Sequence, residues 1–201
     1  PFGECTRNVK AAFRRYIVSA ASAQTYHKDL ICCKIKTSNK MERRGLMSFL
    51  LLILTIVLVD LGIKSAIEDA DPSEFPRELE GSKGFVKLYR NHNDGFPMGV
   101  FRTRPDLVRN VPLVVLSAVG GIFFWISPKK GYLAEKLGTS LVLGGGFSNL
   151  YDRMKRGYVV DYFSIQFKKL KKIVLNIGDI CIFLGAGILL ITEIVETMRD
   201  M

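Results

Sequence analysis

The chain has 201 residues, of which 48% are hydrophobic, and its mean hydropathy of +0.19 is positive. This composition is too apolar for a typical soluble domain of this length and indicates an integral membrane protein. The formal net charge is +10. The basic residues are not interleaved with aromatic side chains, which argues against a nucleic-acid partner and favours contact with anionic lipid head groups.

Residues 1–40 differ from the rest of the chain in charge. They hold eight Lys/Arg and two Asp/Glu, and the composition changes abruptly at Met41. The following stretch, Met-Glu-Arg-Arg, is typical of a protein whose first membrane helix follows a short basic tail. We therefore expect residues 1–40 to be an N-terminal extension outside the core and residues 41–201 to form a four-helix transmembrane domain.

Four segments approach the roughly 20 apolar residues that a helix needs to cross a bilayer. We predict helices at about 45–66, 110–127, 132–153 and 173–198. The third segment is interrupted by charged residues and several glycines. Asp60 and Lys64 are spaced i, i+4 near the end of the first helix, so they can pair on one face as structural polar residues. The predicted fold class is a membrane all-α four-helix bundle.

A small β-rich cap outside the membrane completes the predicted fold. The segment 68–109 has mixed charge and contains four of the seven prolines. Within it, residues 84–89 and 98–102 are predicted to be short strands around a turn at 91–95. Residues 158–163, after the third helix, are also typical of extended structure.

Two motifs carry the strongest chemical signal. The first contains Gly144-Gly-Gly-Phe-Ser-Asn149-Leu-Tyr-Asp152-Arg153 and leads to Val159-Val-Asp161-Tyr162, and the second is Asn176-Ile-Gly178-Asp179. We expect Asp179 about six residues into the last helix, roughly 9 Å below its start. An ionisable group inside the edge of the hydrocarbon is costly, which makes Asp179 a functional candidate by default.

Asp161 and Asp179 are expected on the same side of the membrane, where they can form an aspartic pair. Two close carboxylates do not easily both ionise, so one keeps a proton while the other acts as a base. Such a pair can activate a water molecule and protonate a leaving amine. Asn149, Arg153 and Asn176 are suitable partners for orienting the carboxylates or a substrate backbone.

The residues alone leave a second interpretation open. An aspartate in a transmembrane helix often pairs with a cation, and Arg153 or Lys64 would fill that role for Asp179. The glycines would then serve close helix packing. A small transporter or an assembly factor would use its buried Asp/Arg pairs in this way, without cleaving a peptide bond.

No metal site is predicted, and we expect no cofactor. The four cysteines show neither ligand spacing nor a disulfide pattern: Cys5, Cys32, Cys33 and Cys181. His92 has no other histidine nearby, because His27 lies in the N-terminal extension. We therefore expect His92 to be solvated.

The motifs together resemble one family, signal peptidase II, the bacterial lipoprotein signal peptidase. Its order and spacing are matched by Asp60-Leu-Gly-Ile-Lys64, residues 91–96, 145–153 and 176–179, and Val160-Asp161-Tyr162. The resemblance covers about residues 41–195. It implies a four-helix fold in the bacterial inner membrane with an extracytoplasmic β-cradle. It also implies cleavage of diacylglyceryl-modified prolipoproteins before the lipidated cysteine, without a metal.

The resemblance also implies roles for individual residues. Asp161 and Asp179 match the catalytic aspartates of an aspartic endopeptidase. Five positions match residues around the substrate or the pair: Asn91, Gly145, Asn149, Arg153 and Asn176. Asp152 matches a motif position but is expected to be structural, like Asp60 and Lys64.

Orientation and partners follow from the same resemblance. It places both termini in the cytoplasm and the aspartates toward the extracytoplasmic face of this multi-pass protein, whereas the distribution of Lys and Arg leaves orientation open. The implied partners are lipid-modified prolipoproteins and membrane lipids, and we expect a monomer.

The chain departs from the family pattern in three of the motifs. Asn91-His-Asn-Asp-Gly-Phe96 stands where the family commonly has Asn-x-Gly-Ala-Ala-Phe. Ser148 replaces a preferred Gly, and Gly178 replaces Ala. The first change affects the cap. Because of it, an alternative remains open in which the chain is a non-catalytic relative that binds precursors without cleaving them. Because both aspartates remain, a working enzyme is favoured.

Overall fold

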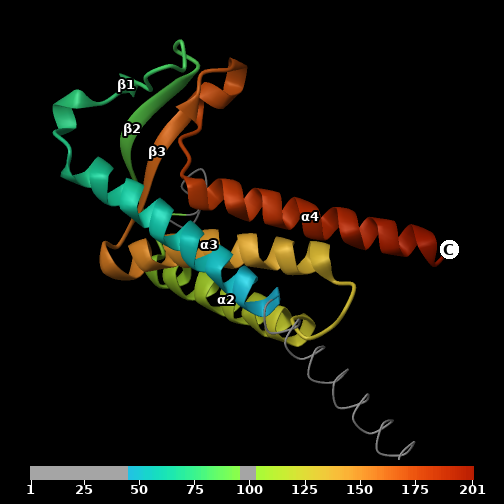
Figure 1. The fold of residues 1–201 in the computed structure, drawn as a ribbon. Helices are drawn as coiled ribbons and strands as arrows, with labels where there is room; N and C mark the ends of the chain where they lie inside the picture. Colours follow the sequence, from blue (N-terminus) through green and yellow to red (C-terminus); the bar gives the residue numbers. More distant parts are fainter. Residues whose placement is uncertain (1–44, 96–102) are drawn as a thin grey trace, which may run out of the picture. The chain divides into compact units, whose positions relative to one another are not determined.

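The computed structural model describes residues 45–95 and 103–201 (Figure 1). Residues 46–201 belong to a single compact unit. The described helices are Gly45–Asp69, α2 (Pro105–Ile126), α3 (Leu133–Lys155) and α4 (Ile177–Arg199). The described strands are β1 (Arg77–Glu78), β2 (Val86–Asn93) and β3 (Val159–Ile165), with short 3-10 helices η1 (Pro72–Glu74) and η3 (Lys168–Lys172). The prediction of a helical protein with a small β-rich part is confirmed.

Three of the described helices are long and apolar enough to cross a membrane: Gly45–Asp69, α2 and α4. Their outward surfaces carry large apolar side chains that are more than half exposed, among them Val114, Trp125, Phe183 and Ile191. Such extensive apolar exposure fits a lipid environment. The chain is therefore a membrane protein.

Helix α3 lies between α2 and α4 (Figure 1). Helices α2 and α3 are held together by an apolar core cluster of Leu116 and Phe123 from α2 with Leu143 and Leu150 from α3. Apolar residues of the Gly45–Asp69 helix pack against this cluster. Because neighbouring helices cover it, α3 can carry small and polar side chains on its buried positions. This explains why its hydropathy is the weakest of the four.

Glycines bring α3 and α4 into close contact. A Cβ atom on Gly145 would collide with the carbonyl oxygen of Gly178, and one on Gly185 would lie 2.5 Å from the carbonyl oxygen of Gly138. The two contacts are separated by seven residues, or about two turns, on each helix. They therefore set the register of the antiparallel helices and bring the first turn of α4 beside the last turns of α3.

The start of α4 differs from the prediction. The helix begins at Ile177 rather than near residue 173, with Asn176 as its N-cap. Asp179 thus lies in the first turn, and the predicted depth of about six residues was wrong. The apolar residues before the cap are extended, and Leu175 bridges to Phe163 of β3, because an apolar run alone does not distinguish a strand from a helix.

The strands form one antiparallel sheet in the order β1-β2-β3. On β2, Leu88 pairs with Phe163 and Asn91 pairs with Asp161, so β2 has one residue more than β3 between these pairs. This extra residue makes a β-bulge. The expected strand 84–89 is part of a longer strand that reaches Asn93, and the expected turn from residue 91 was wrong. The other expected strand, 98–102, lies outside the described residues.

The sheet adjoins the helices through a second apolar cluster. Val160 and Tyr162 of β3 pack with Ile67 near the end of the Gly45–Asp69 helix, and Ile177 of α4 packs against them. Alternate residues of a strand point to opposite faces. Asp161 therefore points away from this cluster, toward the polar region described below.

Candidate active site

Asp161 and Asp179 come from different elements and meet at one asparagine. Asp161 lies on β3 and is 3% exposed, whereas Asp179 lies in the first turn of α4. The side chain of Asn176 donates from Nδ2 to Asp161 Oδ1 over 2.8 Å, and its Oδ1 accepts from the backbone N–H of Asp179, also over 2.8 Å. One amide thus holds a carboxyl of the sheet against the start of a helix.

The surroundings of Asp161 place its proton equilibrium near neutral pH. Burial and, to a lesser extent, the neighbouring Asp179 raise the pKa of Asp161 to about 7, although the hydrogen bonds from Asn93 and Asn176 act to lower it. Asn93 Nδ2 donates to Asp161 Oδ2 over 3.1 Å. A carboxyl with such a pKa exchanges a proton readily near pH 7, as an acid–base catalyst requires.

Both carboxylate oxygens of Asp179 accept hydrogen bonds. Asn149 Nδ2 donates to Oδ1 over 2.8 Å, and the backbone N–H of Asn176 donates to Oδ2 over 3.3 Å. Lys64 Nζ donates to Asn149 Oδ1 over 2.7 Å. This bond turns the nitrogen of the Asn149 amide toward Asp179.

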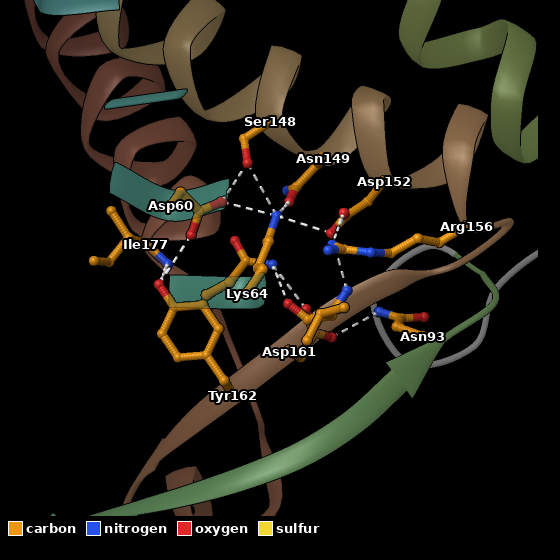
Figure 2. A network of polar contacts seen from close by, with 12 residues as sticks. Asp60, Lys64, Asn93, Ser148, Asn149, Asp152, Arg156, Asp161, Tyr162 and Ile177 are labelled. Atoms are coloured by element: carbon orange, nitrogen blue, oxygen red, sulfur yellow. Dashed lines mark hydrogen bonds and ion pairs between the residues drawn. The ribbon is translucent and has the colours of Figure 1, made fainter. Parts of the chain in front are cut away.

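A buried charge network lies next to Asp161 (Figure 2). Lys64 is fully buried, with Nζ 2.7 Å from Asp60 Oδ2 and 3.3 Å from Asp152 Oδ2. Arg156 pairs with the other oxygen of Asp152. The network contains two cations and two carboxylates, so its charges balance, which is the condition under which buried ions are tolerated.

Two hydroxyl groups complete this network. Tyr162 OH donates to Asp60 Oδ1 over 2.9 Å and accepts from the backbone N–H of Ile177 over 3.0 Å. Ser148 Oγ donates to Asp60 Oδ2 over 2.6 Å. Burial, with the charge of Asp60, raises the pKa of Tyr162, which keeps the phenol protonated as a donor. Figure 2 shows these groups converging from β3, α3, α4 and the Gly45–Asp69 helix.

The remaining residues implied by the resemblance lie around the pair in different ways. Arg153 Nη2 donates to the carbonyl oxygen of Gly95 over 3.3 Å, and Arg153 lines a surface recess with Asp94. Asn91 pairs with Asp161 across the sheet, but its side chain is exposed. Gly145 has no side chain, and its role is to let α3 approach the backbone of α4 at Gly178.

Two cations were proposed as partners of Asp179: the charge of Arg153 acts on Asp179, whereas Lys64 has other partners. Lys64 pairs with Asp60 and Asp152, as given above. Asp152 also accepts a hydrogen bond from the backbone N–H of Val160 over 3.2 Å, which ties the end of α3 to β3. Lys64 therefore belongs to a structural network beside Asp179 rather than to an ion pair with it.

Four contributors were not singled out from the sequence: Asn93, Ser148, Tyr162 and Arg156. Asn93 was assigned to a turn, although its spacing of two residues from Asn91 would place both on one face of a strand. Ser148 was noted only as a departure from the family, and its hydroxyl now has partners in the network. No local signal indicates that Tyr162 or Arg156 bonds to carboxylates on other elements.

His92 is exposed, as expected, but the expectation that it has no partner was wrong. Its Nε2 lies 2.7 Å from Glu68 Oε1, and its ring stacks on Tyr158 with the centroids 4.1 Å apart. Glu68 is 24 residues away in the sequence, and only the fold brings the two side chains together.

Within the described ranges 45–95 and 103–201, no group of three or more His, Cys, Asp or Glu side chains is arranged to hold a metal ion. The two aspartates are instead surrounded by amide donors. This donor set orients carboxyl groups by hydrogen bonds.

Comparisons with known proteins identify the family. The family described as signal peptidase (SPase) II matches residues 52–195. The chain is 30% identical over 162 residues to the lipoprotein signal peptidases of Brucella ovis and Brucella abortus, with 80% of this chain and 98% of each relative covered. Two solved structures of a bacterial membrane enzyme, obtained by the in meso method, share the fold with TM-scores of 0.66 and 0.61 at 19% and 20% identity. They cover 77% and 73% of this chain and 92% of each solved chain. The resemblance predicted from the motifs is confirmed, and the chain belongs to the signal peptidase II family.

Proposed function

We propose that the chain is a membrane aspartic endopeptidase that removes signal peptides from lipoprotein precursors, with Asp161 and Asp179 as its catalytic pair. Membership of the signal peptidase II family makes it a peptidase that acts on lipoprotein precursors. One observation carries the assignment of the pair: the amide of Asn176 contacts both aspartates.

The proposed reaction uses one proton shared by the two carboxyls. The ionised aspartate takes a proton from a water molecule as the water oxygen bonds to the scissile carbonyl carbon. The protonated aspartate stabilises the oxygen that becomes negative. The carbon–nitrogen bond then breaks, and a carboxyl proton passes to the leaving amine. The amides of Asn149, Asn176 and Asn93 hold the carboxyl planes in place without supplying a charge that would ionise both.

The membrane arrangement is part of the proposal. We assign α3 as the fourth transmembrane helix of a four-helix bundle, because its buried polar side chains Ser148, Asn149 and Asp152 are bonded to the Gly45–Asp69 helix, α4 and β3. We place the sheet as a cap on the extracytoplasmic face of the bacterial inner membrane and both termini in the cytoplasm. The aspartates lie where the sheet meets the first turn of α4, which supports a site at the membrane edge.

The substrate and the partners follow from this arrangement. We propose diacylglyceryl-modified prolipoproteins as substrates, cleaved before the lipidated cysteine by a monomer. Residues 1–40 would be dispensable, and residues 41–201 would be the peptidase domain. Membrane lipids would contact the apolar helix surfaces and the basic η3 helix, whose Lys168, Lys171 and Lys172 are exposed. Arg153, beside the recess, and the exposed Asn91 would face the substrate backbone.

A gel-shift cleavage assay tests this function. The full chain in detergent or liposomes is mixed with a diacylglyceryl-modified prolipoprotein, beside Asp161→Asn and Asp179→Asn. We expect each substitution to lower the cleavage rate by roughly 10²–10⁴-fold, as for the loss of an acid–base group. Asp71→Asn is the matched control, because Asp71 is exposed and caps η1, a role that Asn also fills.

The two contradicting results are distinct. Cleavage at the parental rate by a folded Asp161→Asn or Asp179→Asn variant would remove that residue from the catalytic pair. No cleavage by the folded parent, with or without residues 1–40, would favour the non-catalytic membrane binding, assembly or transport role.

A further inference from the structure

Glu68 connects the end of the Gly45–Asp69 helix to the end of β2. Its carboxylate lies 2.7 Å from His92 Nε2 and accepts from Arg90 Nη2 over 3.2 Å. Tyr158 OH donates to the same carboxylate over 3.4 Å, and its ring stacks on His92. Arg90 also donates from Nη1 to the carbonyl oxygen of Ala70 over 3.2 Å. Glu68, Arg90, His92 and Tyr158 are called the Glu68 cluster below.

The cluster acts on the part of β2 that follows the bulge. The ladder between β2 and β3 is interrupted between Leu88 and Asn91, and Arg90 lies in this interruption. A bulge offsets the pairing by one residue, so the first half of the strand does not determine the register of the second half. A one-residue slip would turn every side chain of that half to the opposite face.

Asn93 is the side chain in that half that reaches the catalytic pair. Asn91 pairs directly with Asp161, and Asn93 is two residues further along the same face, from which it donates to Asp161 Oδ2 over 3.1 Å. The backbone N–H of Gly95 donates to Asn93 Oδ1 over 3.1 Å, which turns the amide nitrogen toward Asp161. Arg90 and His92 are bound on the other face, by Glu68.

We propose that the Glu68 cluster is a positioning device for the proposed peptidase, which holds the register of β2 so that Asn93 donates to Asp161. The inference rests on the proposed function, because it assigns a role in catalysis to Asp161. Glu68 and His92 touch neither the reacting atoms nor the aspartates. They act through the backbone of β2 and the amide of Asn93.

The expected consequence is a change in the pH dependence of cleavage. Asn93 is one of two side chains whose hydrogen bonds lower the pKa of Asp161, against burial and Asp179. The other charged groups that act on Asp161 are Lys64 of the Gly45–Asp69 helix and Arg153 of α3. Removing the Asn93 bond therefore raises the pKa of Asp161, and the pH profile of the pair moves to higher pH.

A double-mutant cycle tests the proposal. The pH profile of kcat/KM is measured for the full chain in detergent and for Glu68→Ala, Asn93→Ala and the double variant. We expect each single substitution to move the profile upward by roughly half to one pH unit, the effect of one hydrogen bond to a carboxylate. The double variant should move no further than Asn93→Ala, because both changes remove the same bond.

His92→Ala is the second variant, since the side chain of His92 is 41% exposed and its loss leaves Arg90 on Glu68. It should move the profile in the same direction by a smaller amount. Glu74→Ala is the matched control. Glu74 also forms an ion pair in the cap, with Arg77 at 2.9 Å, and both side chains are about half exposed. Its profile should coincide with that of the parent.

A purely structural role would lower activity by a similar factor at every pH without moving the profile. Unmoved profiles in active Glu68→Ala and His92→Ala, or additive shifts in the double variant, would overturn the positioning role while leaving the peptidase intact. A parent that cleaves nothing would overturn the proposed function itself, and this inference with it.

Discussion

Two neighbouring groups of charged side chains in this protein differ in how their charges are balanced. Around Lys64, two cations face two carboxylates, and all four are tied together by ion pairs. Asp161 and Asp179 instead are two carboxyls whose hydrogen-bond donors are neutral amides and the backbone. The first arrangement joins four elements by ion pairs and hydrogen bonds and contributes to the fold. The second favours sharing one proton, which is useful for chemistry.

Asn149 is where the two groups meet. Its oxygen accepts from Lys64 of the balanced network, and its nitrogen donates to Asp179. The network thus orients the Asn149 amide, which donates to Asp179 and carries no net charge. A buried ionic cluster can thus orient the neutral donor that binds a neighbouring aspartate, and the positive charge of Arg153 also acts on both aspartates.

Breaking the charge balance should have the largest effect on stability. Lys64→Met leaves Asp60 and Asp152 facing the single cation Arg156, and we expect it to lower the free energy of unfolding by roughly 3–5 kcal/mol. Thermal unfolding in detergent measures the loss. Asp60→Asn combined with Lys64→Met restores a neutral network and should recover a large part of it. An equally unstable double variant would show that packing of the lysine, rather than charge, is what matters.

Asp161→Asn should have the opposite effect on thermal unfolding in detergent. It removes a carboxyl that burial and Asp179 hold at a raised pKa, so we expect stability at neutral pH to stay the same or increase while cleavage is lost. A loss of several kcal/mol would place Asp161 with the structural network instead.

Separating α3 from α4 should have an intermediate effect. Gly145→Ala places a Cβ against the carbonyl oxygen of Gly178, and the helices must move apart. We expect a cost of roughly 1–3 kcal/mol, together with a lower kcat because Asn149 and Asp179 no longer meet. Gly121→Ala is the control, since nothing lies within 4 Å of its Cβ position. Equal stability and activity of both variants would contradict the close packing.

The smallest effect is expected at Tyr162. Tyr162→Phe removes one hydroxyl that bonds to Asp60 and to the first backbone N–H of α4. We expect a loss of roughly 1–2 kcal/mol in stability and a modest change in kcat. The matched control is Tyr151→Phe. The hydroxyl of Tyr151 accepts from the exposed Lys155, so its removal should have almost no effect. A large loss of activity with full stability would move Tyr162 into the catalytic group.

The class of protein and its family were predictable from the sequence alone. Long apolar runs, the order of the motifs and the retained aspartates are local properties of the chain, so they indicate a helical membrane protein of the signal peptidase II type. Hydropathy also located the helices, but it missed the start of α4, because the apolar residues before Asn176 belong to an extended segment beside β3.

The tertiary structure alone decided which polar groups meet. It brings Asn93 into hydrogen-bond contact with Asp161, Tyr162 with Asp60 and His92 with Glu68. It also separates a charge-balanced network from the aspartate pair. These contacts join residues 24 to 102 positions apart. They depend on a β-bulge and on the glycine contacts between α3 and α4, and the physical fit of such elements is not a property of any single segment.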